Sequence, residues 1–196
     1  MTDVERRETL AYIAQHAGSV VGFAIANPLP VAGIHPLAYL AVASDRGHPA
    51  RSSDTVAGIH LLAYLAVVEH ERGRGIGTTL LRYVATDLRT QEHARGILIE
   101  VEPPETGPAD ELALRRRRIQ FYSRNGALII TQVPYRIPNL SGTGSIEMRL
   151  MWLPLDGGGQ MLCRPELRDC IAGIYAGRYG RAEGDPLLAS ILRDLV

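Results

Sequence analysis

A turn rich in glycine and arginine carries the clearest chemistry in the sequence. It consists of Arg72, Gly73, Arg74, Gly75, Ile76, Gly77 and Thr78. Glycine lets the chain bend tightly and leaves backbone N–H groups open to a ligand. A helix is predicted to begin at once, and the unpaired N–H groups of a helix N-terminus, together with the helix dipole, favour an anion. The turn therefore predicts a site for a phosphate or pyrophosphate.

The turn can be compared with three known kinds of phosphate-binding loop. A Walker loop needs a lysine after its last glycine, and all 21 Lys+Arg residues here are arginine, which excludes it. A dinucleotide fingerprint needs a third glycine where Thr78 stands, and it needs a second βαβ half that the sequence does not show. The third pattern, Arg/Gln-x-x-Gly-x-Gly/Ala, is met by Arg72, Gly75 and Gly77. On these residues the turn resembles the acetyl-CoA pyrophosphate loop of the GNAT N-acetyltransferase superfamily. A plain glycine-rich turn remains the alternative.

A second segment extends that resemblance. Residues 119–127, IQFYSRNGA, are similar to the family helix in which a tyrosine precedes a glycine by four residues, as Tyr122 precedes Gly126. The resemblance covers about residues 10–155. It implies the GNAT fold, which is a mixed, mostly antiparallel α/β sheet with one central parallel βαβ crossover, flanked by helices. A C-terminal helical tail would follow.

The resemblance also implies how acetyl-CoA, the co-substrate, would bind. Backbone N–H groups of residues 72–78 would hold its pyrophosphate, and Arg72 and Arg74 would add positive charge. Val67 and Val68, at the end of the preceding strand, would pair with the pantetheine arm as an added strand does. A main-chain N–H near Val68 would polarise the thioester carbonyl in the manner of an oxyanion hole.

The implied reaction is direct attack of an amine on the acetyl group, without an acetyl-enzyme. Tyr122 would protonate the departing thiolate. Its ordinary pKa of about 10, above a thiol pKa of about 8.5, keeps the phenol protonated and available at neutral pH; the alternative is a tyrosine that only packs on the sheet. A carboxylate would take the proton from the amine, and the candidates are Glu69, Glu100 and Glu102. Strand alternation places Glu100 and Glu102 on one face. The resemblance implies a gap where the strands after Val68 and before Glu102 separate to admit the thioester, and Glu102 ranks first because it is closest to that gap. The alternative is that these glutamates are only solvated charges at strand ends.

The elements that must position these residues follow from the hydrophobic pattern. A hairpin is expected over residues 9–27, a buried strand over 61–68, and a helix whose core face is Leu80, Leu81, Val84, Ala85 and Leu88. Further strands are predicted over 97–102, 127–133 and 145–153, and further helices over 110–124, 165–179 and 185–195. The strand over 145–153 should turn Ile146, Met148, Leu150 and Trp152 to one side. The last two helices should pack on the core or on a partner subunit.

The sequence contains an internal duplication. Residues 31–42 (VAGIHPLAYLAV) recur as residues 56–67 (VAGIHLLAYLAV), with Pro36 against Leu61. We predict that the second copy forms the central strand, because it leads into the glycine turn and because Pro36 cannot donate a ladder hydrogen bond. The first copy would be an insertion followed by a loop over 44–55. Three alternatives remain open for the first copy: it takes the place of the second copy in the sheet, it adds an edge strand, or it pairs with another chain.

Composition excludes several other functions. The formal charge is zero and the four residues 115–118, all arginine, point around a helix, so no nucleic-acid surface is expected. No apolar run of about 18 residues occurs and the first ten residues are charged, which predicts no membrane segment, no secretory signal and a cytoplasmic location. The isolated Cys163 and Cys170 and the scattered histidines predict no metal site. Without lysine, Schiff-base chemistry is excluded.

The predicted organisation is a GNAT-like domain over residues 1–155 with a duplicated insertion over 31–55, a linker over 156–160 and a helical extension over 161–196. The resemblance implies a strand and two helices that wall the acceptor site before the hairpin, but few residues precede the hairpin here. This wall is missing unless residues 31–55 or the C-terminal helices replace it. The predicted function is acetyl transfer to an amine of a small molecule or a protein. The alternative is a catalytically degenerate acetyl-CoA-binding module with a structural or regulatory role. A homodimer is left open.

Overall fold

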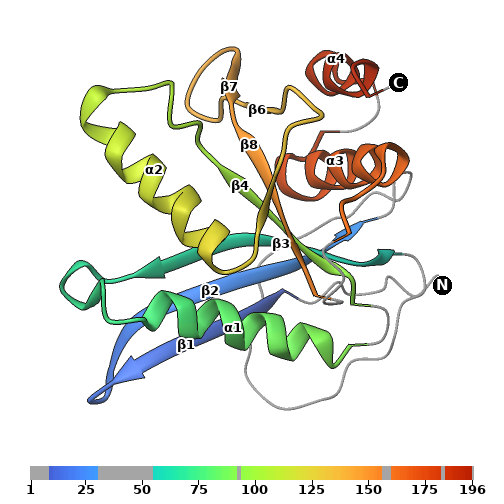
Figure 1. Ribbon diagram of the computed structural model, residues 1–196. Coiled ribbons are helices and arrows are strands. Elements are labelled where there is room, and N and C mark those ends of the chain that lie inside the picture. The colour runs from blue at the N-terminus through green and yellow to red at the C-terminus, as the bar shows by residue number, and fades with distance from the viewer. Residues whose placement is uncertain (1–8, 31–54, 92–93, 156–159, 182–183, 196) are drawn as a thin grey trace.

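A six-stranded mixed sheet forms the centre of the protein (Figure 1). The computed structural model describes residues 9–30, 55–91, 94–155, 160–181 and 184–195. The strand order is β1-β2-β3-β4-β8-β5, and β3 and β4 form its parallel pair while the other neighbours are antiparallel. The strands are β1 (Leu10–His16), β2 (Ser19–Pro30), β3 (Thr55–Val67), β4 (Gly96–Val101), β5 (Leu128–Ile130) and β8 (Arg149–Pro154). The predicted fold class is confirmed.

The central strand β3 comes from the second copy of the duplicated segment. It pairs with β4 from Ile59 opposite Gly96 to Leu62 opposite Ile99. On its other side β3 pairs with β2, which forms the predicted hairpin with β1. The prediction for the second copy is confirmed. The first copy and residues 44–54 of the expected loop lie outside the described residues.

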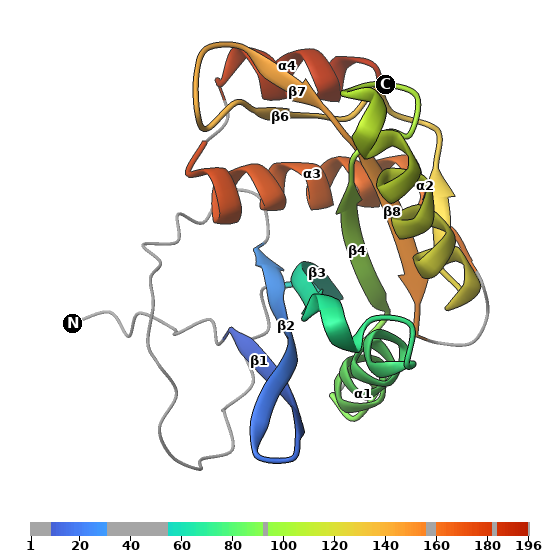
Figure 2. The same ribbon diagram turned by 90° about the vertical axis from the view of Figure 1, so that its left-hand side faces the viewer.

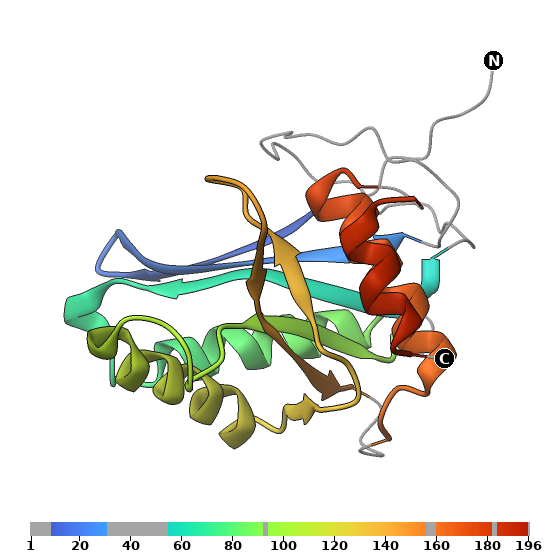
Figure 3. The same ribbon diagram turned by 90° about the horizontal axis from the view of Figure 1, so that it is seen from above.

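Two helices cover one side of the sheet. Helix α1 (Ile76–Arg89) connects β3 to β4 as a crossover, and its buried side chains are the predicted ones: Leu80, Leu81, Val84, Ala85 and Leu88. Helix α2 (Ala109–Arg124) lies beside it and buries Ile119 and Tyr122 in the same hydrophobic cluster (Figure 3). This side of the sheet therefore carries both motifs on which the sequence prediction depends.

The C-terminal helices cover the other side of the sheet. Helix α3 (Arg164–Tyr179) crosses β2 and β3 (Figure 2), and its apolar residues Leu167, Ile171 and Ile174 are fully buried. Helix α4 (Pro186–Arg193) begins at Asp185, whose carboxylate accepts hydrogen bonds from two backbone N–H groups of its first turn at 3.0 Å each. The tail thus packs on the core of its own chain. The domain boundaries at 155 and 161 remain a prediction.

One predicted strand is divided in the structure. Residues 145–153 form β7 (Ser145–Glu147), which pairs with β6 (Arg136–Pro138) in a separate ribbon, and β8 in the main sheet. The break occurs at Met148, whose N–H donates to the Tyr135 carbonyl at 3.0 Å instead of to a sheet neighbour. Leu150 and Trp152 face the core as predicted, whereas Ile146 is 43% exposed. A single strand with one buried face is therefore wrong for this segment.

The neighbouring strand β5 is also shorter than predicted. It ends at Ile130, opposite Leu150, because the chain leaves the ladder before Pro134, a residue with no N–H to donate. Within the described ranges, no helix is long and apolar enough to cross a membrane.

Candidate functional site

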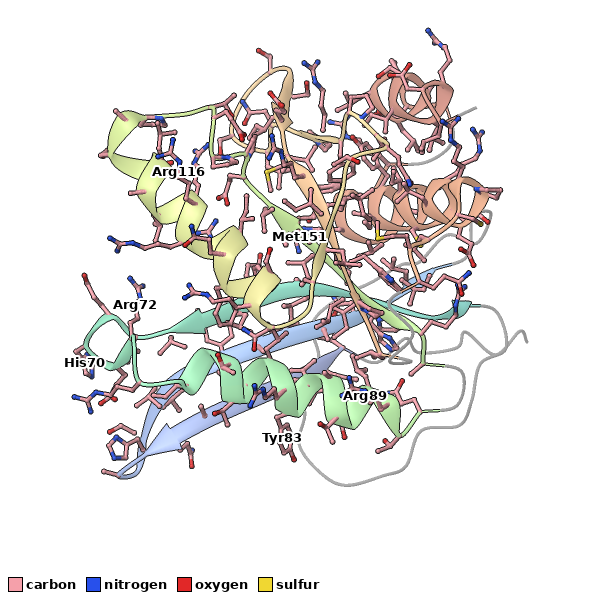
Figure 4. All side chains as sticks on the ribbon, viewed as in Figure 1. His70, Arg72, Tyr83, Arg89, Arg116 and Met151 are labelled. Carbon is pink, nitrogen blue, oxygen red and sulfur yellow. The ribbon has the colours of Figure 1, made fainter. Side chains whose placement is uncertain are left out.

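The glycine turn leads from β3 into α1 by way of one short 3-10 helix, Glu69–Glu71 (Figure 4). Gly73 and Gly75 have φ angles of +81° and +83°, a region that side chains disfavour. Gly75 is the N-cap of α1, and no side chain caps that helix end. The turn therefore delivers an uncapped helix N-terminus just beyond the end of β3.

Six consecutive backbone N–H groups in this turn are free. In the described part of the chain, none of the N–H groups of residues 73–78 has a hydrogen-bond partner, and the first helical bond is from Thr79 N–H to the Gly75 carbonyl at 2.9 Å. Unpaired N–H groups at a helix N-terminus, with the helix dipole behind them, form an anion site. The predicted location of the phosphate site thus has the required geometry.

The two arginines of the turn flank these N–H groups. Arg72 donates from Nε to the Val67 carbonyl at 3.1 Å, and Arg74 pairs with Glu71 at 3.2 Å. Both side chains lie on the surface (Figure 4 labels Arg72). They place positive charge at the turn, although each already has a protein partner.

The parallel strands separate next to this turn. The last paired residues of β3 and β4 are Leu62 and Ile99, while β3 continues along β2 as far as Val67. The Val68 N–H donates to the Val21 carbonyl at 3.0 Å, so of the N–H groups near Val68 this one is not available to a thioester. Because neighbouring residues of a strand point their N–H groups to opposite sides, the Val67 N–H points away from β2 and into the opening.

Tyr122 lies on α2 beside the same opening. Its side chain is 7% exposed, and no hydrogen-bond partner contacts its hydroxyl within the described residues. Burial raises the pKa of Tyr122 to about 12, with a smaller opposing contribution from Arg118. The preceding residue, Phe121, comes within 3.4 Å of the position that a Cβ on Gly77 would take. The tyrosine helix and the glycine turn are therefore packed together.

The carboxylate ranked first by sequence, Glu102, is a poor base. It follows the last residue of β4 and forms an ion pair with Arg118 of α2. Burial acts to raise the pKa of the Glu102 carboxyl, but the hydrogen bonds and the charge of Arg118 outweigh it and lower the pKa below its ordinary value. Because the strand ends at Val101, the prediction that Glu100 and Glu102 share a face is wrong. Glu69 lies exposed in the turn.

Glu100 lies on the opposite side of the sheet, against α3. Its side chain is 8% exposed, and its Oε1 accepts hydrogen bonds from the Tyr135 hydroxyl at 2.6 Å and the Tyr179 hydroxyl at 2.9 Å. Its Oε2 is 3.2 Å from Arg178 Nε. No sequence pattern indicates these three partners, since they come from a loop and a helix that only the fold brings to β4.

A pocket of about 350 Å³ adjoins the Glu100 cluster through Tyr135. It lies where β5 and β8 part, and its lining residues are Ile129, Ile130, Thr131, Val133, Pro134, Tyr135, Arg136, Glu147, Met148 and Arg149. None of the predicted coenzyme-binding residues lines it. The pocket is therefore on the side of Glu100 and not of the glycine turn.

The family model described as the acetyltransferase (GNAT) family matches residues 2–116, more than half of the chain. The chain belongs to this family. GNAT acetyltransferases transfer an acetyl group from acetyl-CoA to amine acceptors, and acetyl-CoA is therefore the co-substrate of this chain. The match includes the glycine turn and ends before Tyr122.

Solved structures of GNAT proteins have a similar fold. One, described as an acetyltransferase from the GNAT family of Bacteroides thetaiotaomicron, is 19% identical, with 87% of this chain and 73% of that chain covered and a TM-score of 0.56. The ribosomal-protein-S18-alanine N-acetyltransferase from Escherichia coli is 18% identical, with coverages of 79% and 74% and a TM-score of 0.45. At this identity only the fold is shared. No curated protein matches this GNAT chain significantly by sequence.

Proposed function

We propose that the protein is an N-acetyltransferase in which the acceptor amine attacks acetyl-CoA directly. The observation that carries this proposal is the run of free N–H groups over residues 73–78, placed beside the opening between β3 and β4. The free N–H groups can bind a pyrophosphate, and the opening can admit the acyl arm that is attached to it. Together they match the two ends of acetyl-CoA.

In this proposal the coenzyme follows β3 from the turn to the opening. Residues 72–78 hold the pyrophosphate, with charge from Arg72 and Arg74. The backbone of Val67 pairs with the pantetheine arm, and Val68 borders it. The Val67 N–H is the main-chain group near Val68 that polarises the thioester carbonyl, because it points toward the opening.

The reaction proceeds through a tetrahedral intermediate. The neutral amine forms a bond to the thioester carbon while the carbonyl electron pair moves to oxygen. The intermediate then collapses, the C–S bond breaks, the thiolate leaves with its electron pair, and the nitrogen gives up one proton to solvent. Tyr122 donates a proton to that thiolate. We propose that the acceptor enters on the side of the opening where Glu100 lies. Glu102 lies on the other side of the sheet, where it is paired with Arg118 and its pKa is lowered.

Replacing Tyr122 with phenylalanine is expected to lower kcat by about 10²–10⁴-fold, the usual contribution of a general acid. The dissociation constant of acetyl-CoA should stay within a factor of about two, because the Tyr122 hydroxyl has no hydrogen-bond partner to lose among the described residues. CoA release over a panel of amines measures kcat, and calorimetry measures binding. The control is Tyr83→Phe on the exposed side of α1 (Figure 4), which should leave kcat unchanged. A fully active Tyr122→Phe enzyme would remove the acid role.

The raised pKa of Tyr122 has a consequence for the pH profile. Since burial raises this pKa to about 12, the phenol stays protonated and able to donate at pH 10. At saturating concentrations of both substrates, kcat should therefore not fall between pH 8 and pH 10. A decline with a midpoint near pH 10 that disappears in Tyr122→Phe would show an unperturbed tyrosine and contradict this placement.

A second candidate is an acetyl-CoA-binding module without turnover. The observation that favours it is that two of the three candidate carboxylates, Glu100 and Glu102, are ion-paired with arginine. Acetyl-CoA binding together with no CoA release for any amine would support the module. Absence of acetyl-CoA binding would contradict both candidates.

A further inference from the structure

The side chain of Arg178 bridges the opening between the two parallel strands. Glu100 is the first residue of β4 beyond the last pair, Leu62 and Ile99, and Tyr64 lies two residues beyond that pair on β3. Arg178 reaches both edges: its Nε is 3.2 Å from Glu100 Oε2, and its Cζ is 5.3 Å from the centroid of the Tyr64 ring. Helix α3, which belongs to the predicted C-terminal extension, therefore places a cation at the acceptor side of the opening.

The surroundings of this guanidinium have the composition of a cation site. A carboxylate that is 8% exposed supplies the charge, and the hydroxyls of Tyr135 and Tyr179 orient it. Two aromatic faces complete the site, since Arg178 Cζ is also 5.8 Å from the Tyr179 ring centroid. A cation over an aromatic face is attracted by the ring quadrupole, and more strongly when it loses water.

We propose that Glu100, Tyr64 and Tyr179 form a subsite for a positively charged group of the acceptor, and that Arg178 occupies this subsite in the free protein. The proposal rests on the proposed function and names the acceptor class: amines that carry a second ammonium or a guanidinium group. Arg178 is then an internal competitor that such an acceptor displaces.

The position of Arg178 suits displacement. It lies in the last turn of α3, its side chain is 28% exposed, and Tyr64 is 55% exposed, so an incoming cation can reach the same faces. Because the Glu100 carboxylate is almost fully buried, it needs a charged partner, and a competing cation of equal charge can take the place of the Arg178 guanidinium. A neutral acceptor has no charge with which to displace it.

The test uses two coenzyme A thioethers whose binding does not depend on turnover. In both, the sulfur carries an acetamide bridge with a short alkyl tail; in one the tail ends in an ammonium group and in the other in a methyl group. Calorimetry gives the ratio of the two affinities, with tails of two, three and four methylenes. In Arg178→Gln the ratio should shift at least about fivefold toward the charged tail relative to the natural protein, because the competing guanidinium is gone and Glu100 has lost its positively charged partner.

Three further variants make the result specific. Arg181→Gln removes an arginine that pairs with Asp185 near the same helix end, and should leave the ratio unchanged. The double variant Glu100→Gln/Arg178→Gln should lose the preference for the charged tail. Arg178→Lys keeps the charge balance and should shift the ratio in the same direction by a smaller factor, so the proposal stays testable if Arg178→Gln does not fold.

An unchanged ratio in both Arg178 variants would overturn the proposal and leave a structural link between α3 and β4. A shift that persists in the double variant would also overturn it, because the carboxylate would not be the partner. If neither thioether binds the natural protein, the proposed function itself fails, and this inference fails with it.

Discussion

Replacing Gly75 with valine is expected to weaken acetyl-CoA binding by at least about 100-fold. Gly75 has a φ of +83°, and a residue with a side chain pays about 1–2 kcal/mol to adopt that left-handed conformation. The turn will relax by rotating its peptide groups away from the anion site. Losing two charge-assisted hydrogen bonds, each contributing about 1.5–3 kcal/mol, accounts for a loss of that size. Calorimetric titration with acetyl-CoA measures it.

The matched control is Gly18→Val in the turn between β1 and β2. Gly18 has a φ of +80°, and, as at Gly75, nothing lies within 4 Å of the position of an added Cβ. Both substitutions should cost a similar amount of stability, measured by urea unfolding, but only the one at Gly75 should affect the coenzyme. If folded Gly75→Val binds acetyl-CoA as tightly as Gly18→Val does, the pyrophosphate is not held by this turn.

Replacing Gly96 with valine is expected to destabilise the fold by about 3 kcal/mol or more. A Cβ at this position would lie 2.1, 2.4 and 2.7 Å from three atoms of the Trp152 ring. Neither side can move easily, because Gly96 is held between Ile59 and Pro154 in the sheet and Trp152 is 2% exposed. Overpacking a core usually costs about 1–3 kcal/mol, and a rigid ring in a fixed ladder belongs at the upper end or beyond.

Urea unfolding followed by circular dichroism tests this prediction, and the fluorescence of Trp152, the only tryptophan, reports its surroundings. The compensating variant is Gly96→Val/Trp152→Leu, in which a smaller, flexible side chain leaves room for the valine. It should recover at least half of the lost stability. A single variant as stable as the natural protein would mean that the ring does not pack on Gly96.

The motifs were predictable from sequence where a local pattern sufficed. The apolar spacing of α1 and the glycines at 73 and 75 depend on residues a few positions apart, and the structure has them as expected. The second copy of the duplication could be placed in the sheet because it is continuous with the turn. The break at Met148 could not be foreseen, because the alternation of residues 145–153 fits a single strand and only the Tyr135 carbonyl diverts it.

The sequence by itself determined the strand, turn and helix that offer an anion a row of free N–H groups, because backbone geometry there follows from glycine and from helix periodicity. The tertiary structure alone decided which backbone N–H faces the opening, because that depends on the register between β2 and β3. It also decided the roles open to the carboxylates: Glu102 is paired with α2, and Glu100 is enclosed by Tyr135 and by the end of α3, contacts that join residues up to 79 positions apart. Such contacts leave no periodic trace in a single sequence, and they decide which charged groups lie at the opening between β3 and β4.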